Sequence, residues 1–148
     1  MKKVIIAIAI VFAVTTSAFA SSKETIESIE RSVKEKFSSE FKGASDVQWT
    51  VTENAYLAIF TLNGNRMEAL FTNSGEYIGT SISITLEDLP LKAKRSFAKK
   101  YEGYTVKEAQ KYMLVDETAY YILAEKDAKK VIVKLSDHGD LSIAKMIK

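Results

Sequence analysis

The sequence predicts an α+β protein of two tandem units, each a helix packed on a four-stranded antiparallel meander sheet. Three observations support this prediction: an internal repeat, an apolar stripe of helical period opening each copy, and short alternating segments after it. The repeat aligns "VKEKFSSEFKG" at 33–43 with "AKRSFAKKYEG" at 93–103, and "NSGE" at 73–76 with "DHGD" at 137–140. We therefore expect residues 21–84 and 85–148 to form the two units of one compact domain.

The first 20 residues have the pattern of an export signal. Two lysines precede an uncharged apolar run at 4–14, and the segment ends in the small-residue motif "AFA" at 18–20. This ending is typical of a cleavage site, and the run is shorter than the roughly 20 apolar residues that a membrane-spanning helix needs. We expect cleavage near Ala20, a periplasmic or secreted location, and a mature chain that starts at Ser21 without a membrane anchor.

Composition limits the partners and the sources of stability. Two of the 21 basic residues lie in the export segment, so cleavage leaves 19 basic residues beside 19 acidic ones. A formally neutral mature chain gives no reason to expect nucleic acid as a partner. Cysteine is absent, so a hydrophobic core must stabilise the exported protein in place of disulfides.

Each unit opens with a helix. In the first, apolar residues recur three and four positions apart, which is typical of one buried helix face. These residues are Ile26, Ile29, Val33, Phe37 and Phe41. Gly43 follows this helix and Gly103 follows the second, as is common at helix ends.

The second helix is expected to start near Pro90, with Thr85 or Asp88 as its cap, because proline is tolerated in the first helical turn. Its inner face is expected to contain Leu91, Ala93, Phe97 and Tyr101.

Short strands are expected after each helix. In the first unit they cover about 46–53, 55–62, 65–72 and 77–84. The Asn63-Gly64 pair suits a two-residue hairpin turn in which both residues take positive φ. In the second unit, the segments at 106–115 and 141–147 alternate less clearly.

The hairpin turn also predicts which side chains share a face of the sheet. In the first unit it pairs Phe60 with Met67 on the helix side and Ile59 with Glu68 on the other side. The same register in the second unit gives an all-apolar side and a mixed side. The pairs expected there are Ala124–Val131, Ile122–Val133 and Tyr120–Leu135 on the first side, and Glu125–Lys130, Leu123–Ile132 and Tyr121–Lys134 on the second.

The side of the sheet away from the helices combines apolar residues with charges, as interaction surfaces do. The predicted binding face consists of Leu57, Ile59, Arg66, Glu68, Leu70, Tyr121, Leu123, Lys130, Ile132 and Lys134. The sequence equally allows these to be ordinary half-buried sheet positions, or to be hidden between the two units, because a unit of about 60 residues is marginally stable alone.

The single histidine, His138, lies between Asp137 and Asp140 and is the one candidate for catalysis or metal binding. The equivalent "TNSGE" at 72–76 has no histidine, and no second histidine or cysteine is available to complete a zinc site. No nucleophile motif, phosphate-binding glycine loop or dinucleotide fingerprint occurs. We interpret 136–140 as a turn and expect no catalytic residue, cofactor or metal; a small hydrolase or metal-dependent enzyme using His138 is the alternative.

Several short motifs resemble those of the PepSY-like, beta-lactamase-inhibitor-like (BLIP-like) family of exported bacterial proteins. They are "LP" at 89–90, "YEGY" at 101–104 and the "DHGD" turn, with "FKGASDVQW" at 41–49 and "FTNSGE" at 71–76 in the first unit. The resemblance implies two helix-plus-sheet units with a concave binding surface, and the wider PepSY group is associated with inhibiting or chaperoning secreted enzymes. Inhibition of beta-lactamase is not carried over, because the cysteines of the true inhibitor are missing.

These observations together predict an exported, non-catalytic binding protein. Its expected partner is another protein in the cell envelope or outside the cell. A carrier that holds a small apolar ligand on its curved sheets is the second alternative.

Overall fold

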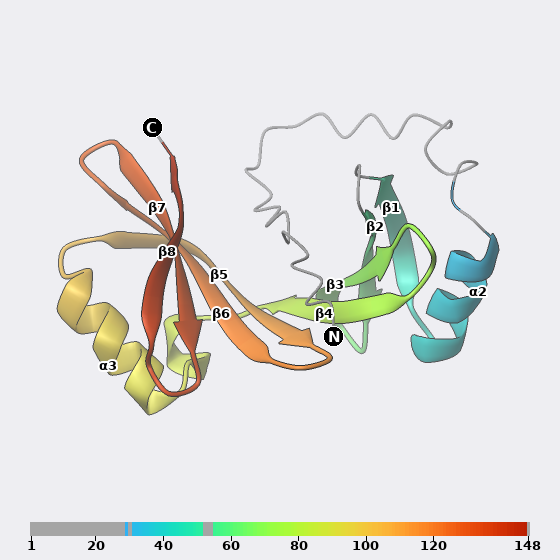
Figure 1. The fold of residues 1–148 in the computed structure, drawn as a ribbon, viewed down its shortest axis with the longest axis horizontal. Helices are drawn as coiled ribbons and strands as arrows, with labels where there is room; N and C mark the ends of the chain where they lie inside the picture. The colour runs from blue at the N-terminus through green and yellow to red at the C-terminus, as the bar shows by residue number, and fades with distance from the viewer. Residues whose placement is uncertain (1–28, 30, 52–54, 148) are drawn as a thin grey trace, which may run out of the picture.

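The computed structural model describes residues 29, 31–51 and 55–147 and shows an α+β fold with one eight-stranded antiparallel sheet (Figure 1). The strands lie side by side in chain order, from β1 to β8. The first half contains α2 (Arg31–Glu40), β1 (Ser45–Val51), β2 (Ala55–Leu62), β3 (Asn65–Thr72) and β4 (Tyr77–Ser83). The second half contains the 3-10 turn η1 (Leu86–Asp88), α3 (Leu91–Lys100), β5 (Thr105–Leu114), β6 (Thr118–Lys126), β7 (Lys129–Ser136) and β8 (Leu141–Ile147). Within the described residues, every helix is too short or too polar to cross a membrane.

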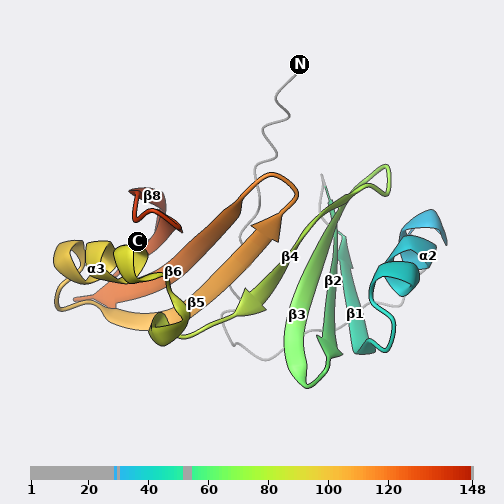
Figure 2. The same ribbon diagram turned by 90° about the horizontal axis from the view of Figure 1, so that it is seen from below.

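The strands of the two halves form one sheet rather than a separate four-stranded sheet in each half. Strand β4 pairs with β5 from Gly79 opposite Leu114 to Ser83 opposite Gln110. This pairing satisfies the backbone hydrogen bonds of two strands that would otherwise be exposed edges. The helices α2 and α3 lie at opposite ends of the molecule (Figure 2).

The predicted hairpin register is confirmed in both halves. Asn63 and Gly64 have positive φ, +51° and +79°, as the two-residue turn requires. The confirmed pairs include Phe60–Met67, Ile59–Glu68, Ile122–Val133 and Leu123–Ile132. The side chains therefore divide between the two faces of the sheet as the sequence predicts.

On the helix side of the first half, α2 covers an aromatic core. Val33 and Phe37 are the buried residues of the helix, and Ile26 lies outside the described residues. The ring centroid of Phe37 is 5.0 Å from that of Phe60 and 5.3 Å from that of Trp49. Phe41, which follows the end of the helix, packs against the same core.

On the helix side of the second half, α3 covers a core of aliphatic and aromatic residues. Its Ala93 and Phe97 side chains are buried and belong to one cluster with the inward residues of β6 and β7. The fully buried members of these strands are Ile122, Ala124, Val133 and Leu135.

The start of α3 differs from the prediction. Thr85 is the N-cap residue of η1, and its N–H and hydroxyl donate to the Asp88 carboxylate at 2.8 and 2.9 Å. Pro90 is the N-cap residue of α3. The prediction that Leu91 lies on the inner face is wrong, because its side chain is 62% exposed. Leu91 and Ala93 are two positions apart, about 200° around a helix, so both cannot face the sheet.

Candidate functional site

The segment that contains His138 is the turn between β7 and β8. The Ser136 N–H donates to the Asp140 carbonyl at 3.0 Å, and the Gly139 N–H donates to the Ser136 carbonyl at 3.1 Å. Residues 72–76 make the same two bonds at 2.8 and 2.9 Å. The two turns thus share one backbone arrangement, although only one contains a histidine.

The acidic side chains around His138 serve this turn. Asp137 accepts a hydrogen bond from the Tyr120 hydroxyl at 2.9 Å, and Asp140 accepts one from the Ser136 hydroxyl at 3.0 Å. His138 itself is exposed. Across the ranges that the structure describes, no group of three or more His, Cys, Asp or Glu residues could hold a metal ion.

All ten residues of the predicted binding face lie on the side of the sheet opposite the helices, here called the helix-free face. Its apolar members form one cluster with residues of both halves and are 3–9% exposed. The cluster comprises Leu57, Ile59, Leu70, Tyr112, Ala119, Tyr121, Leu123 and Ile132. The apolar part of the predicted face is therefore buried, whereas Arg66 is exposed and Glu68, Lys130 and Lys134 are half-buried.

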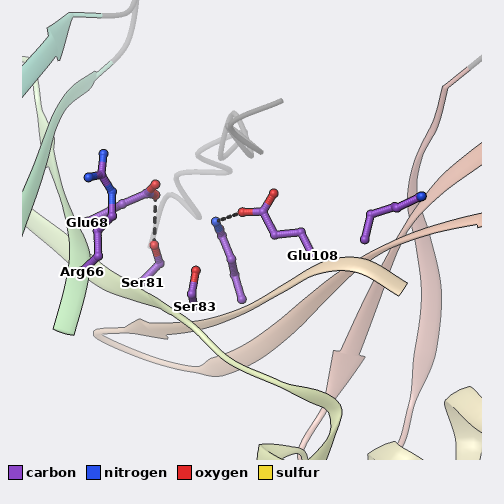
Figure 3. Close-up of a pocket in the computed structure, with 7 residues that line it drawn as sticks. Arg66, Glu68, Ser81, Ser83 and Glu108 are labelled. Carbon is purple, nitrogen blue, oxygen red and sulfur yellow. Dashed lines mark hydrogen bonds between the residues drawn. The ribbon is translucent and has the colours of Figure 1, made fainter. Parts of the chain in front are cut away.

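A polar cleft of about 370 Å³, here called the central cleft, lies on β3, β4 and β5, where the two halves join (Figure 3). It is lined by Arg66, Glu68, Ser81, Ser83, Lys107, Glu108 and Gln110. Glu68 is opposite Ser81, and Ser83 is opposite Gln110. Side chains that are directly opposite in neighbouring strands share a face, and Ser81 and Ser83 are two positions apart on β4, so the two pairs lie next to each other on one face of the sheet.

Buried neutral groups hold the two carboxylates of the cleft. Ser81 donates from Oγ to Glu68 Oε2 at 3.0 Å, and Gln110 donates from Nε2 to Glu108 Oε1 at 2.8 Å. The Tyr112 hydroxyl in turn donates to Gln110 Oε1 at 2.9 Å. Ser81, Gln110 and Tyr112 are at most 4% exposed, so packing fixes the donors that position the carboxylates.

Burial raises the pKa of Glu68, and the negative charge of Glu108 raises it further, while the Ser81 hydrogen bond and Arg66 oppose the shift. Burial also raises the pKa of Glu108, against the hydrogen bond from Gln110. Two ion pairs of the second half join Lys107 to Glu125 at 3.6 Å and Lys134 to Glu117 at 3.0 Å. In the described part of the chain, neither Glu68 nor Glu108 forms an ion pair.

These pKa shifts predict how stability depends on pH. Because folding raises both pKa values above the ordinary 4.5, the folded chain binds more protons than the unfolded chain between the ordinary and the raised values. The contribution of this pair to stability therefore increases as pH falls from 7 through the raised pKa values, and it levels off below 4.5.

The Glu68→Gln/Glu108→Gln double variant removes this unfavourable desolvation, so we expect a higher urea midpoint than that of the wild type at pH 7. The difference should shrink as the pH approaches 4.5. A variant that is no more stable at pH 7 would show that the carboxylates are not desolvated.

The central cleft brings together two predicted residues, Arg66 and Glu68, with five that the sequence analysis missed. The missed residues are Ser81, Ser83, Lys107, Glu108 and Gln110. They lie on β4 and β5, for which no register was predicted. The available signal was the two-residue spacing of Ser81 with Ser83 and of Glu108 with Gln110, which places polar groups on one face of each strand.

Comparison with solved structures identifies the fold. A BLIP-like protein from Bacteroides fragilis superposes with a TM-score of 0.68 at 19% sequence identity, over 80% of this chain and 86% of that one. The chain has a BLIP-like fold. A DUF2874 family protein from Bacteroides ovatus gives a TM-score of 0.70 at 18% identity, over 80% of this chain and 90% of that one. A protein from Bacteroides eggerthii, provisionally described as periplasmic, gives a TM-score of 0.72 at 18% identity, over 80% of this chain and 87% of that one.

These comparisons support the BLIP-like part of the sequence resemblance and give no support to its PepSY-like part. No family model and no curated protein matches the sequence. At identities below 20%, the BLIP-like neighbours establish the arrangement of helices and strands alone.

Proposed function

We propose that the mature chain is an exported, non-catalytic binding protein that engages another protein through the helix-free face, centred on the central cleft. The observation that carries this proposal is the pair of half-buried carboxylates, Glu68 and Glu108, which have no ion-pair partner in the described residues and lie in a cleft on paired strands. A site on sheet strands holds its polar groups more accurately than a site on loops does. The buried apolar cluster beside the cleft supplies a rigid support.

Export is part of the proposal. The lysine-flanked apolar run at 4–14 and the "AFA" motif at 18–20 favour cleavage near Ala20. The B. eggerthii neighbour, whose provisional name places it in the periplasm, is consistent with this location.

The proposal also includes two tandem units, 21–84 and 85–148. The matching turn bonds at 72–76 and 136–140 support this division, as do the positive φ values of Gly43 (+87°) and Gly103 (+81°). The first unit supplies β3 and β4 to the central cleft, and the second supplies β5. The site would therefore depend on the joining of the two units.

A bulky side chain placed in the cleft tests the proposed face. The mature chain from Ser21 is used to capture its partner from an envelope extract, and the affinity for the purified partner is then measured. Ser83 is exposed and lines the cleft, so Ser83→Trp is expected to fill it and to weaken binding at least tenfold, which corresponds to about 1.4 kcal/mol. Ser38→Trp is the matched control, because Ser38 is exposed on α2 and its replacement should leave the affinity unchanged. Equal effects of the two variants would exclude the helix-free face.

A further inference from the structure

The central cleft has acceptor capacity that the described residues leave unused. From the described side chains, Glu68 accepts a hydrogen bond through Oε2 alone, and Glu108 accepts one through Oε1 alone. Both donors are neutral, so they do not cancel the carboxylate charges. Lys107, the lysine that lines the cleft, is already near Glu125, and Arg66 is exposed and forms no ion pair with Glu68 within the described residues. Among the described residues that line the cleft, the charges without an ion pair are those of Arg66, Glu68 and Glu108, so their sum is one negative charge.

The size and lining of the cleft fit one long side chain with a cationic end. Its volume of about 370 Å³ is near the lower limit of ligand pockets, which range from about 300 to 1,000 Å³. Five of the seven lining residues have long side chains with methylene groups, and a long basic side chain can pack its stem on such groups while its charged head makes polar contacts.

A guanidinium suits this arrangement better than an ammonium. The two carboxylates come from different strands, β3 and β5, and a planar guanidinium has five N–H donors that can serve separate acceptors. Hydrogen bonds between charged partners are also about twice as strong as neutral ones.

We propose that the central cleft receives an arginine side chain of the partner protein, with its guanidinium between the free carboxylate oxygens of Glu68 and Glu108. This inference rests on the proposed function and specifies the chemistry of the partner. A bound guanidinium offsets the desolvation of the two carboxylates and their mutual repulsion. Removing either charge therefore weakens binding, although it also removes the desolvation cost and the charge repulsion in the free protein.

Side-chain analogues test the inference without the partner. The mature chain is titrated at pH 7 with n-butylguanidinium, n-butylammonium and the neutral n-butylurea, and NMR follows the Gln110 side-chain amide and the Ser81 backbone amide. We expect saturable shifts with n-butylguanidinium, weaker binding of n-butylammonium and no saturable shift with n-butylurea. The Glu68→Gln/Glu108→Gln variant should lose at least tenfold in affinity for n-butylguanidinium. The control, Glu40→Gln/Glu102→Gln, changes exposed acids at the ends of the helices and should bind as the wild type does.

Several results would overturn the inference: equal shifts with n-butylurea, guanidinium binding that survives in the double variant, tighter binding of n-butylammonium, or no saturable shift. The Ser83→Trp capture experiment separates this failure from failure of the proposed function. If Ser83→Trp weakens capture but the cleft does not bind n-butylguanidinium, the arginine inference is wrong and the protein-binding function is supported. If n-butylguanidinium binds but capture is independent of the helix-free face, the proposed function is wrong.

Discussion

Replacing Phe60 with alanine is expected to lower the free energy of unfolding by about 3–5 kcal/mol, the usual cost of deleting a buried aromatic side chain. Phe60 is 1% exposed, and its ring centroid is 5.0 Å from that of Phe37 and 4.8 Å from that of Phe41. The substitution leaves a cavity between β2 and the chain that covers it. Urea unfolding of the mature chain measures the loss.

Ile143→Ala is the control for Phe60→Ala, because Ile143 is 51% exposed on the edge strand β8. Its cost should be about 0.5 kcal/mol, as is usual for surface positions. If the two substitutions had equal effects, the placement of Phe60 in the aromatic core beneath α2 would be wrong.

Gly79→Ala is expected to cost about 3 kcal/mol, at the upper end of the usual range for overpacking. A Cβ at this position would lie 2.6 Å from the Met113 carbonyl oxygen and 3.0 Å from the Leu114 Cα. Both atoms belong to the backbone of β5, so the clash is relieved only by separating β4 from β5. Because this pair of strands joins the two halves, the substitution should also shift the NMR signals of the central cleft.

Gly64→Ala is the matched control for Gly79→Ala. A Cβ at Gly64 would contact nothing within 4 Å, and the cost arises from its φ of +79°. A residue with a side chain pays about 1–2 kcal/mol in this conformation. If Gly64→Ala proved the more damaging substitution, the close approach of β4 and β5 would be wrong.

The sequence predicted the local parts of the fold because local signals specify them. The Asn63-Gly64 turn sets the pairing of β2 with β3, and alternation then assigns each side chain to a face. The same reasoning correctly separated Phe60 from Ile59 and Ile122 from Leu123. The segment 136–140 was correctly interpreted as a turn, because its backbone hydrogen bonds join residues within the segment itself.

The junction of the two halves could not be predicted in this way. Strands β4 and β5 are separated in the chain by η1 and α3, so no turn sets their register. The central cleft depends on that pairing, which explains why its β4 and β5 residues were missed. The burial of the apolar face residues also depends on contacts across both halves, as Leu57 and Ile132 in one cluster illustrate.

The distribution of charge on the helix-free face is the basis of the proposed binding function. Lys107 and Lys134 are paired with glutamates, whereas the carboxylates of Glu68 and Glu108 have only neutral hydrogen-bond donors among the described residues. A partner that supplies a cation would satisfy them. In this proposal, the two halves together hold a binding site that neither could form alone.

The binding footprint of the captured partner tests this central claim most directly. Backbone amide shifts of the mature chain are mapped by NMR in the presence and absence of the purified partner. We expect the shift changes to be concentrated in β3, β4 and β5, with α2 and α3 unchanged. Changes concentrated in the two helices, with β3 to β5 unaffected, would contradict it.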